Sequence, residues 1–333
     1  MHMADGLITP MVAGVMYAAS AATAVYSVKK VRQEDNAKKI PLMGVMGAFV
    51  FAVQMINFTI PGTGSSGHLC GGLLLSVILG PYAAFLTMIS ILLIQCLMFA
   101  DGGLLALGCN IWNMAFYGCF IGYLCVYKPI VKNSANTGRI IAGSILGSII
   151  GLQLGAISVV VETILSGVAE IPFGVFAALM QPIHLAIGIG EGLITAAVLT
   201  FVTNARPELL NNADAKKGRI SYRKTLAVLA VTAILAAGGL SLAASANPDG
   251  LEWSIEKITG ATDVQIDGGI YNTAADMQKT TSVLPDYTFS DSDNAAGTTV
   301  SGILGCSIVA AVCIGGCYMF KLFKKKKGAK TNA

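Results

Sequence analysis

Long apolar stretches, separated by short polar or charged segments, occupy most of this 333-residue chain. Most of them reach the roughly 20 residues that a helix needs to cross a bilayer. They predict an all-α polytopic membrane protein, with about seven transmembrane helices up to Asn204 and two more after Lys224 that flank a small extracytoplasmic loop or domain. The stretches lie at about 7–28, 40–60, 69–79, 81–100, 104–127, 140–166, 172–203, 225–246 and 301–320.

The composition of the chain agrees with this pattern. Hydrophobic residues make up 54% of it and charged residues only 12%, whereas soluble domains carry roughly 25% charged residues. The opening segment Met1–Gly6 contains an acid and no Lys or Arg, so it lacks the positive region of a secretory signal peptide. We therefore expect Met1 to be retained, with a free α-amine once its formyl group is removed.

The distribution of basic residues predicts the orientation. Four segments hold 20 of the 22 Lys and Arg residues, and the positive-inside rule places them in the cytoplasm: 29–39, 128–139, 204–224 and 321–333. This placement requires 69–100 to cross twice, as a hairpin that turns near Gly80 and Pro81. We expect a multi-pass protein of the bacterial cytoplasmic membrane, with its N-terminus outside and its C-terminus in the cytoplasm. The outer face then carries the N-terminus, loop 61–68 and the turns at 101–103 and 167–171.

The last outer segment, 247–300, has nine acidic residues against two lysines, a net charge of −7. Its content of Gly, Asn, Ser and Thr fits both a small folded domain and a mostly disordered loop. Such a segment would raise the local cation concentration, although solvation of an exposed loop explains the charge equally well. The chain divides into a membrane domain at 1–204, a cytoplasmic linker at 205–224 and a second domain at 225–333, in which membrane helices 225–246 and 301–320 flank 247–300 and a basic cytoplasmic tail follows.

The first two residues form a chelating group for a metal ion. The α-amine of Met1, the amide nitrogen of His2 and the Nδ1 atom of His2 can close a five-membered and a six-membered ring around one cation. A fourth nitrogen would complete a square, an arrangement that favours Ni(II) or Cu(II) and permits cobalt. His68 is the strongest candidate for the fourth ligand, because it lies on the predicted outer face after a loop of small residues.

A second tier of candidate residues lies in or near the membrane. His184 and Glu191 are seven residues apart on one helical face, where they form either part of a functional site or a His–Glu pair that fixes helix packing. Glu162 is either an acid behind the metal ligands or a simple interfacial residue. The eight cysteines contain no C-x-x-C pair and fit small buried residues, although Cys70 is only two residues from His68.

Nucleotide chemistry has little support in the sequence. The run Gly62–Gly67 fits the pattern G-x-G-x-x-G, but it joins two membrane segments rather than a strand and a helix. We expect no cofactor, no nucleic-acid partner and no enzymatic activity. An intramembrane metalloenzyme would need a general base near His68, and we expect no sufficiently polar residue there. A stand-alone secondary transporter would predict internal repeats, and none is visible.

Three motifs resemble a known family. The opening MHMADG, the loop IPGTGSSGH with the following LCGGLL, and the segment ADGGLLALGCN are similar to the substrate-binding membrane subunit of energy-coupling-factor nickel/cobalt transporters, the CbiM/NikM family. Residues 248–252 resemble the PDGLE signature of the small accessory subunit of these transporters (CbiN/NikN-like), here fused to the same chain. Met3 and Ala4 depart from the usual opening of the family but do not change the chelating positions.

The resemblance implies a function and a set of partners. It implies high-affinity uptake of Co²⁺ or Ni²⁺, the former for cobalamin synthesis, with the metal held by Met1, His2 and His68. It also implies a transmembrane coupling subunit (CbiQ/NikQ-like) and ATPase subunits (CbiO/NikO-like) in the same lipid membrane. The sequence itself leaves the choice between nickel and cobalt open.

Overall fold

The computed structural model describes residues 1–34, 39–132, 136–168, 170–210, 220–264, 266, 268–289 and 295–331. Helices account for 79% of the structure, which confirms the all-α class. Residues 211–219, the greater part of the predicted linker, lie outside the described residues.

The predicted membrane segments correspond to helices of unequal length. Six helical segments are long and apolar enough to cross a membrane: α1 (Pro10–Glu34), α4 (Pro81–Phe99), the continuous Leu107–Val131, α7 (Thr137–Ser166), α8 (Phe173–Ala205) and Ala296–Gly316 within α12 (Ala295–Thr331). The segment Leu107–Val131 comprises α5 (Leu107–Asn110), the π-helical η2 (Ile111–Tyr127) and α6 (Lys128–Val131). The other three are shorter: α2 (Lys39–Gln54), α3 (Gly72–Leu79) and α9 (Tyr222–Gly238).

The segment before α3 differs from the expected helix. Helix α2 ends at Gln54 rather than near residue 60, and a β-hairpin of β1 (Phe58–Ile60) and β2 (Ser65–Gly67) follows. The glycine run that resembled a dinucleotide motif lies in the turn of this hairpin, where Gly62 and Gly64 each have φ of 78°. An apolar composition does not prevent this, because residues 61–71 lie partly within protein rather than lipid, where an irregular backbone is tolerated.

The expected hairpin at 69–100 is present, with a short first arm. Helix α3 has eight residues and is only about 12 Å long. Gly80, with φ of 84°, separates it from α4 and lies near the Nζ atom of Lys39 at the start of α2. Residues 68–71 therefore connect β2 to α3 without regular secondary structure, and Gly71 at their end has φ of 80°.

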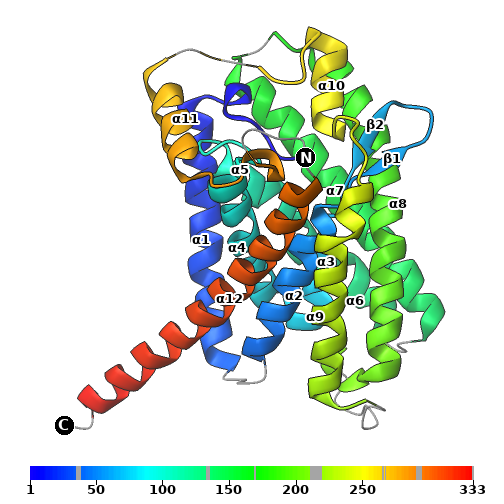
Figure 1. The fold of residues 1–333 in the computed structure, drawn as a ribbon, viewed down its shortest axis with the longest axis vertical. Helices are drawn as coiled ribbons and strands as arrows, with labels where there is room; N and C mark the ends of the chain where they lie inside the picture. Colours follow the sequence, from blue (N-terminus) through cyan, green and yellow to red (C-terminus); the bar gives the residue numbers. More distant parts are fainter. Residues whose placement is uncertain are drawn as a thin grey trace.

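The C-terminal helices belong to the same bundle as the rest. Helices α9 and α12 both pack on α2, and α12 also packs on α4. A Cβ atom on Gly302 would lie 2.4 Å from the carbonyl oxygen of Ala237, so α12 can cross α9 this closely only with glycine there. In Figure 1 the end of α12 points away from the N-terminus, which lies at the other end of the bundle.

The described residues of 247–289 form a folded cap over the end of the bundle that carries Met1, which we call the Met1 end (Figure 1). The cap contains α10 (Gly250–Thr259), α11 (Gly269–Thr281) and the short turn η5 (Pro285–Tyr287). Gln278 of α11 donates from Nε2 to the carbonyl oxygen of Gly102 at 2.7 Å, and Tyr271 donates to the carbonyl of Ile8 at 2.9 Å. Of the two alternatives for this segment, its described residues therefore form the folded domain.

Candidate metal centre

The N-terminal segment is fixed in the bundle rather than frayed. The Met3 N–H donates to Oδ1 of Asn110 at 2.7 Å, and the Asn110 Nδ2 donates back to the Met3 carbonyl at 3.1 Å. The Gly103 N–H also donates to that carbonyl, at 2.8 Å. A Cβ atom on Gly103 would lie 1.9 Å from Oδ1 of Asp5, so the turn at 101–103 can approach the terminus only with glycine at this position.

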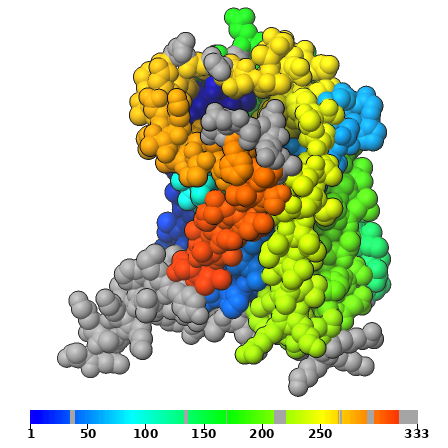
Figure 2. All heavy atoms as spheres, viewed as in Figure 1, coloured from blue at the N-terminus to red at the C-terminus, as the bar shows by residue number. Residues whose placement is uncertain are grey.

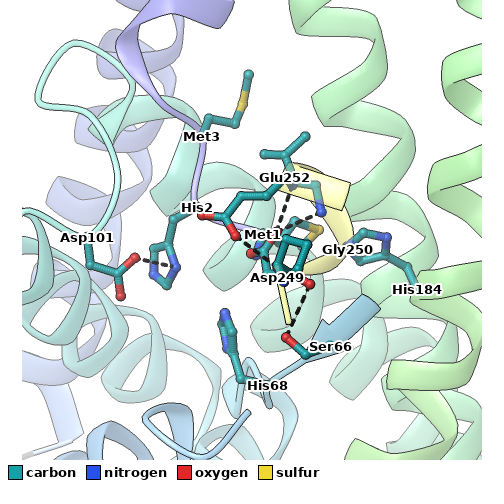
Figure 3. A network of polar contacts seen from close by, with 12 residues as sticks. Met1, His2, Met3, Ser66, His68, Asp101, His184, Asp249, Gly250 and Glu252 are labelled. Carbon is teal, nitrogen blue, oxygen red and sulfur yellow. Dashed lines mark hydrogen bonds and ion pairs between the residues drawn. The ribbon is translucent and has the colours of Figure 1, made fainter. Parts of the chain in front are cut away.

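The α-amine of Met1 forms an ion pair with Oδ2 of Asp249, 248 residues away in the sequence (Figure 3). Burial alone would lower the pKa of this amine, but the Asp249 carboxylate outweighs burial and raises it above its ordinary value. Burial would conversely raise the pKa of Asp249, and the charge of the amine holds it below its usual range instead. The metal-free protein therefore holds a charged amine against a charged carboxylate.

His2 and His68 lie side by side at the Met1 end. Their rings stack with centroids 5.3 Å apart and an interplanar angle of 23°. The Nδ1 atom of His68 lies 3.0 Å from the carbonyl oxygen of Leu69. Because a carbonyl can only accept, Nδ1 carries the proton and Nε2 keeps its lone pair.

A chain of two glutamines fixes a proton on Nε2 of His2. The Gln54 Nε2 donates to the carbonyl of Cys70 at 2.7 Å, so its amide oxygen faces Gln95 and accepts from the Gln95 Nε2 at 3.0 Å. Gln95 must then present its own oxygen to His2, whose Nε2 lies 3.2 Å away and donates. The other ring nitrogen, Nδ1, is the one that the predicted chelate uses.

The carboxylate of Asp101 lies beside Nδ1 of His2. Its Oδ1 lies 3.0 Å from Nδ1 of His2, and because a carboxylate oxygen only accepts, Nδ1 donates to it in the metal-free protein. Its Oδ2 accepts a hydrogen bond from the hydroxyl of Tyr287 in the cap at 2.6 Å. Burial lowers the pKa of His2, with Asp101 opposing it. Burial and the nearby positive amine of Met1 lower the pKa of His68 to about 4. Burial thus favours the neutral form of both imidazoles, the form that binds metal ions, and a metal at His2 would replace the Nδ1 proton that faces Asp101.

A cavity of about 1190 Å³ opens between the bundle and the cap and is lined by both His2 and His68. Figure 2 shows N-terminal residues at the bottom of a hollow between the cap helices. None of the described lining residues is Lys or Arg, and six are acidic: Asp5, Asp101, Asp249, Glu252, Asp263 and Asp286. Such a lining attracts cations. Across the described residues, no three His, Cys, Asp or Glu side chains are grouped to hold a metal, so any site here depends on the backbone nitrogens as well.

His184 and Glu191 do not pair with each other as one alternative required. The Nδ1 atom of His184 bonds to the Met180 carbonyl at 2.7 Å. The carboxylate of Glu191 accepts the backbone N–H groups of Cys70 at 2.8 Å and Gly71 at 3.1 Å. Glu191 thus fixes the start of α3 directly after His68. Cys70 itself is buried, and both its backbone groups are engaged.

Glu162 connects to the N-terminus through one intermediate residue. It is buried and accepts hydrogen bonds from Nδ2 of Asn113 at 2.7 Å and from the hydroxyl of Ser158 at 3.2 Å. Asn113 also lies 3.6 Å from the sulfur of Met3. Glu162 is therefore a buried acid behind the N-terminal segment rather than an interfacial residue.

Sequence reasoning missed four polar residues of this site. Asp101, Gln95 and Gln54 lie within or beside apolar segments, and their role depends on contacts between helices that no local pattern reports. Asp249 belongs to the PDGLE run, which was a usable signal. We expected no residue polar enough to act as a general base beside His68; in the structure the charge of Asp249 influences the pKa of His68.

The fold and the site define a multi-pass helical membrane protein with two imidazoles and a buried α-amine gathered at one end. A family model described as the cobalt uptake substrate-specific transmembrane region, CbiM, matches residues 2–209, and a PDGLE domain matches residues 223–322. The chain belongs to the CbiM family, and it carries a PDGLE domain after the family region.

Relatives and solved structures agree with this assignment. The putative fused nickel transport protein NikMN of Archaeoglobus fulgidus is 35% identical over 94% of this chain and 96% of its own length. The fused nickel transport protein NikMN of Rhodobacter capsulatus is 30% identical over 93% of this chain and 95% of its own. A crystal structure of a truncated transition metal transporter has a TM-score of 0.54 and 32% identity, covering 61% of this chain and 98% of that one.

Replacement of Gln54 by Leu tests the glutamine chain. Gln54→Leu leaves the Cys70 carbonyl without its donor and frees the Gln95 amide to turn, so the bond from Nε2–H of His2 to Gln95, which orients the His2 ring, is weakened. We expect Ni(II) affinity, measured by calorimetry on detergent-purified protein, to fall about 10-fold or more. Gln153→Leu is the matched control, because Gln153 bonds only to Gln181 on α8. Equal losses in both variants would contradict a specific role for the chain.

Proposed function

We propose that this chain is the substrate-binding membrane subunit of an ATP-driven uptake transporter for nickel or cobalt. The observation that carries this proposal is the meeting of the Met1 amine, His2 and His68 at the bottom of a cavity lined by acidic residues. The transport functions named for the relatives support the same conclusion.

The metal is the cargo of the protein, and its ligands are proposed to be four nitrogens. Met1 would supply its amine, His2 its amide nitrogen and Nδ1, and His68 an imidazole nitrogen. Four nitrogens in a plane suit Ni(II) and are compatible with cobalt, whereas Mg²⁺ and Ca²⁺ prefer oxygen. The acidic side chains of the cavity would concentrate hydrated cations without retaining them.

Binding must compete with protons. The amine pKa is raised by Asp249, and the amine must lose a proton before its lone pair can bind the metal. The amide nitrogen of His2 must lose one as well. The apparent affinity is therefore expected to increase as the pH rises, and acidification should favour release.

Energy for uptake is proposed to come from separate subunits. The sequence contains no Walker motif, and family resemblance points to ATPase subunits working through a transmembrane coupling subunit. The coupling subunit would reorient this chain so that the site opens toward the cytoplasm. The Met1 end would face outward at rest, since α6 and the C-terminal end of α12, which belong to the basic segments of the sequence, lie toward the other end of the bundle.

The ligand assignment predicts different effects for two histidines. His68→Ala should weaken Ni(II) binding more than about 100-fold, beyond the 10- to 100-fold typical of outer-shell partners, and should abolish the square-planar absorption band. His184→Ala is the control, because His184 contacts the Met180 carbonyl and not His2. Loss of the band in His184→Ala and its survival in His68→Ala would place the metal elsewhere, and the proposed capture site would be wrong.

The orientation predicts which surface cysteines are accessible in intact cells. In a cysteine-free background, Cys introduced at Thr63, Glu170 or Thr280 of the Met1 end should react with an impermeant maleimide. Cys introduced at Lys132 or Thr137, which are exposed at the opposite end, should react only after permeabilisation. The reverse labelling pattern would show that the Met1 end faces the cytoplasm and would overturn capture from outside.

A further inference from the structure

The PDGLE segment docks on the hairpin that precedes His68. The Ser66 N–H donates to the carbonyl of Pro248 at 2.8 Å, and the Ser66 hydroxyl donates to the carbonyl of Asn247 at 2.8 Å. Ser66 and Asp249 form a parallel β-bridge. The cap is thus joined to the edge of the hairpin by a single β-bridge, two residues from a proposed metal ligand.

The two carboxylate oxygens of Asp249 have different partners. Its Oδ1 accepts the N–H groups of Leu251 at 2.7 Å and Glu252 at 3.0 Å, which caps α10. The Glu252 carboxylate in turn accepts the Asp249 N–H at 2.9 Å, completing a capping box. Because these bonds fix the rotamer of Asp249, its Oδ2 is held rigidly toward the Met1 amine. The Asp249 side chain is only 13% exposed.

Gly250 allows this arrangement to approach α8. A Cβ atom on residue 250 would lie 2.6 Å from Cγ2 of Ile183 and 3.1 Å from Cε1 of His184, as the position of His184 beside Gly250 in Figure 3 indicates. Ile183 is β-branched and buried, so it cannot move away cheaply. Leu251 is also buried, 2% exposed, against the bundle. The contacts of this segment with β2, its capping of α10 and its packing on α8 together fix the position of Oδ2 of Asp249.

We propose that Asp249 is a positioning residue for the metal site, and that the fused cap acts by holding the Met1 amine where the metal will bind. This inference rests on the proposed function. When the metal binds, the amine gives one proton to solvent, donates its lone pair to the metal and keeps two N–H groups. One of these N–H groups can continue to donate to Oδ2. Asp249 then remains hydrogen-bonded to the ligand amine, and its negative charge lies close to the metal cation.

An alternative role for Asp249 is general attraction of cations, shared with the other acids of the cavity. Asp263 separates the two roles. It belongs to the same cap and lines the same cavity, and it forms no ion pair with the amine. A purely electrostatic role predicts similar effects for neutralising either residue, whereas positioning predicts an effect for Asp249 alone.

The test uses the full chain in detergent with Ni²⁺ as the probe. Asp249→Asn retains an N-cap residue as good as Asp but loses the ion pair, and Gly250→Ala displaces Asp249 without changing any charge. Both should weaken Ni(II) binding about 10- to 100-fold, the effect of removing an outer-shell partner. Asp263→Asn should change it by less than about threefold. The absorption spectrum at saturating Ni²⁺ should stay that of wild type in all variants, because the ligands are unchanged.

A second measurement does not depend on metal. Reaction of the metal-free protein with an amine-selective reagent, followed by mass spectrometry of the N-terminal peptide, should be slow for wild type and Asp263→Asn and faster for Asp249→Asn and Gly250→Ala. Wild-type affinity and slow labelling in Asp249→Asn and Gly250→Ala would overturn the inference, as would equal losses in Asp249→Asn and Asp263→Asn. Failure of wild-type protein to bind either Ni²⁺ or Co²⁺ would instead refute the proposed function, while the labelling would still show whether Asp249 holds the amine.

Discussion

The burial of a charged α-amine is the constraint on which the Met1 end depends. An uncompensated charge in a protein interior costs several kcal/mol, so the amine of Met1 requires a counter-charge, and the chain supplies it from Asp249 in the cap. The cap, in turn, is folded and docked through the same residues that present this carboxylate. Removal of either partner would leave the other buried and unpaired, so N-terminus and cap are expected to form or open together.

The second constraint is the way His68 reaches the site. A continuous helix from residue 69 onward would keep this histidine at a helix end. In the structure, however, residues 68–71 are not helical, and the short α3 begins only at Gly72. Glu191 accepts the two N–H groups at its start and Gln54 donates to the Cys70 carbonyl. These bonds satisfy the backbone that the missing helical turns leave unpaired, so the irregular path stays rigid. Because the N-terminal segment and the segment around His68 are both held by hydrogen bonds, the imidazoles of His2 and His68 can stack without a metal between them.

The sequence predicted the parts of this structure that depend on local composition. Hydropathy placed the six helical segments that are long and apolar enough to cross a membrane, and the rule of basic cytoplasmic loops required the hairpin at 69–100 that the structure contains. It also put His2 and His68 at the same end of the bundle, where the structure brings them together. The chelate that Met1 and His2 can form involves two adjacent residues, so its prediction needed no knowledge of the tertiary structure.

Long-range polar contacts were beyond the sequence. Three features depend on how helices distant in the chain approach each other. They are the ion pair of Met1 with Asp249, the chain of glutamine hydrogen bonds from Cys70 to His2, and the separate hydrogen-bond partners of His184 and Glu191. Helical periodicity put the last two on one face, yet it cannot say which neighbouring backbone groups they meet. The end of α2 at Gln54 could not be predicted either, because apolar residues continue beyond it into the hairpin.

The central claim is that the α-amine of the chain is a metal ligand, and formylation of Met1 tests it most directly. Protein produced with deformylase inhibited has the same sequence and keeps every side chain, but its N-terminal nitrogen becomes an amide, which carries no charge and has no free amine lone pair for the metal. Calorimetry with Ni²⁺ should show affinity more than about 100-fold lower for the formylated protein than for the deformylated protein, a loss larger than that of an outer-shell partner. Equal affinities for the two forms would contradict the account and exclude the amine from the site.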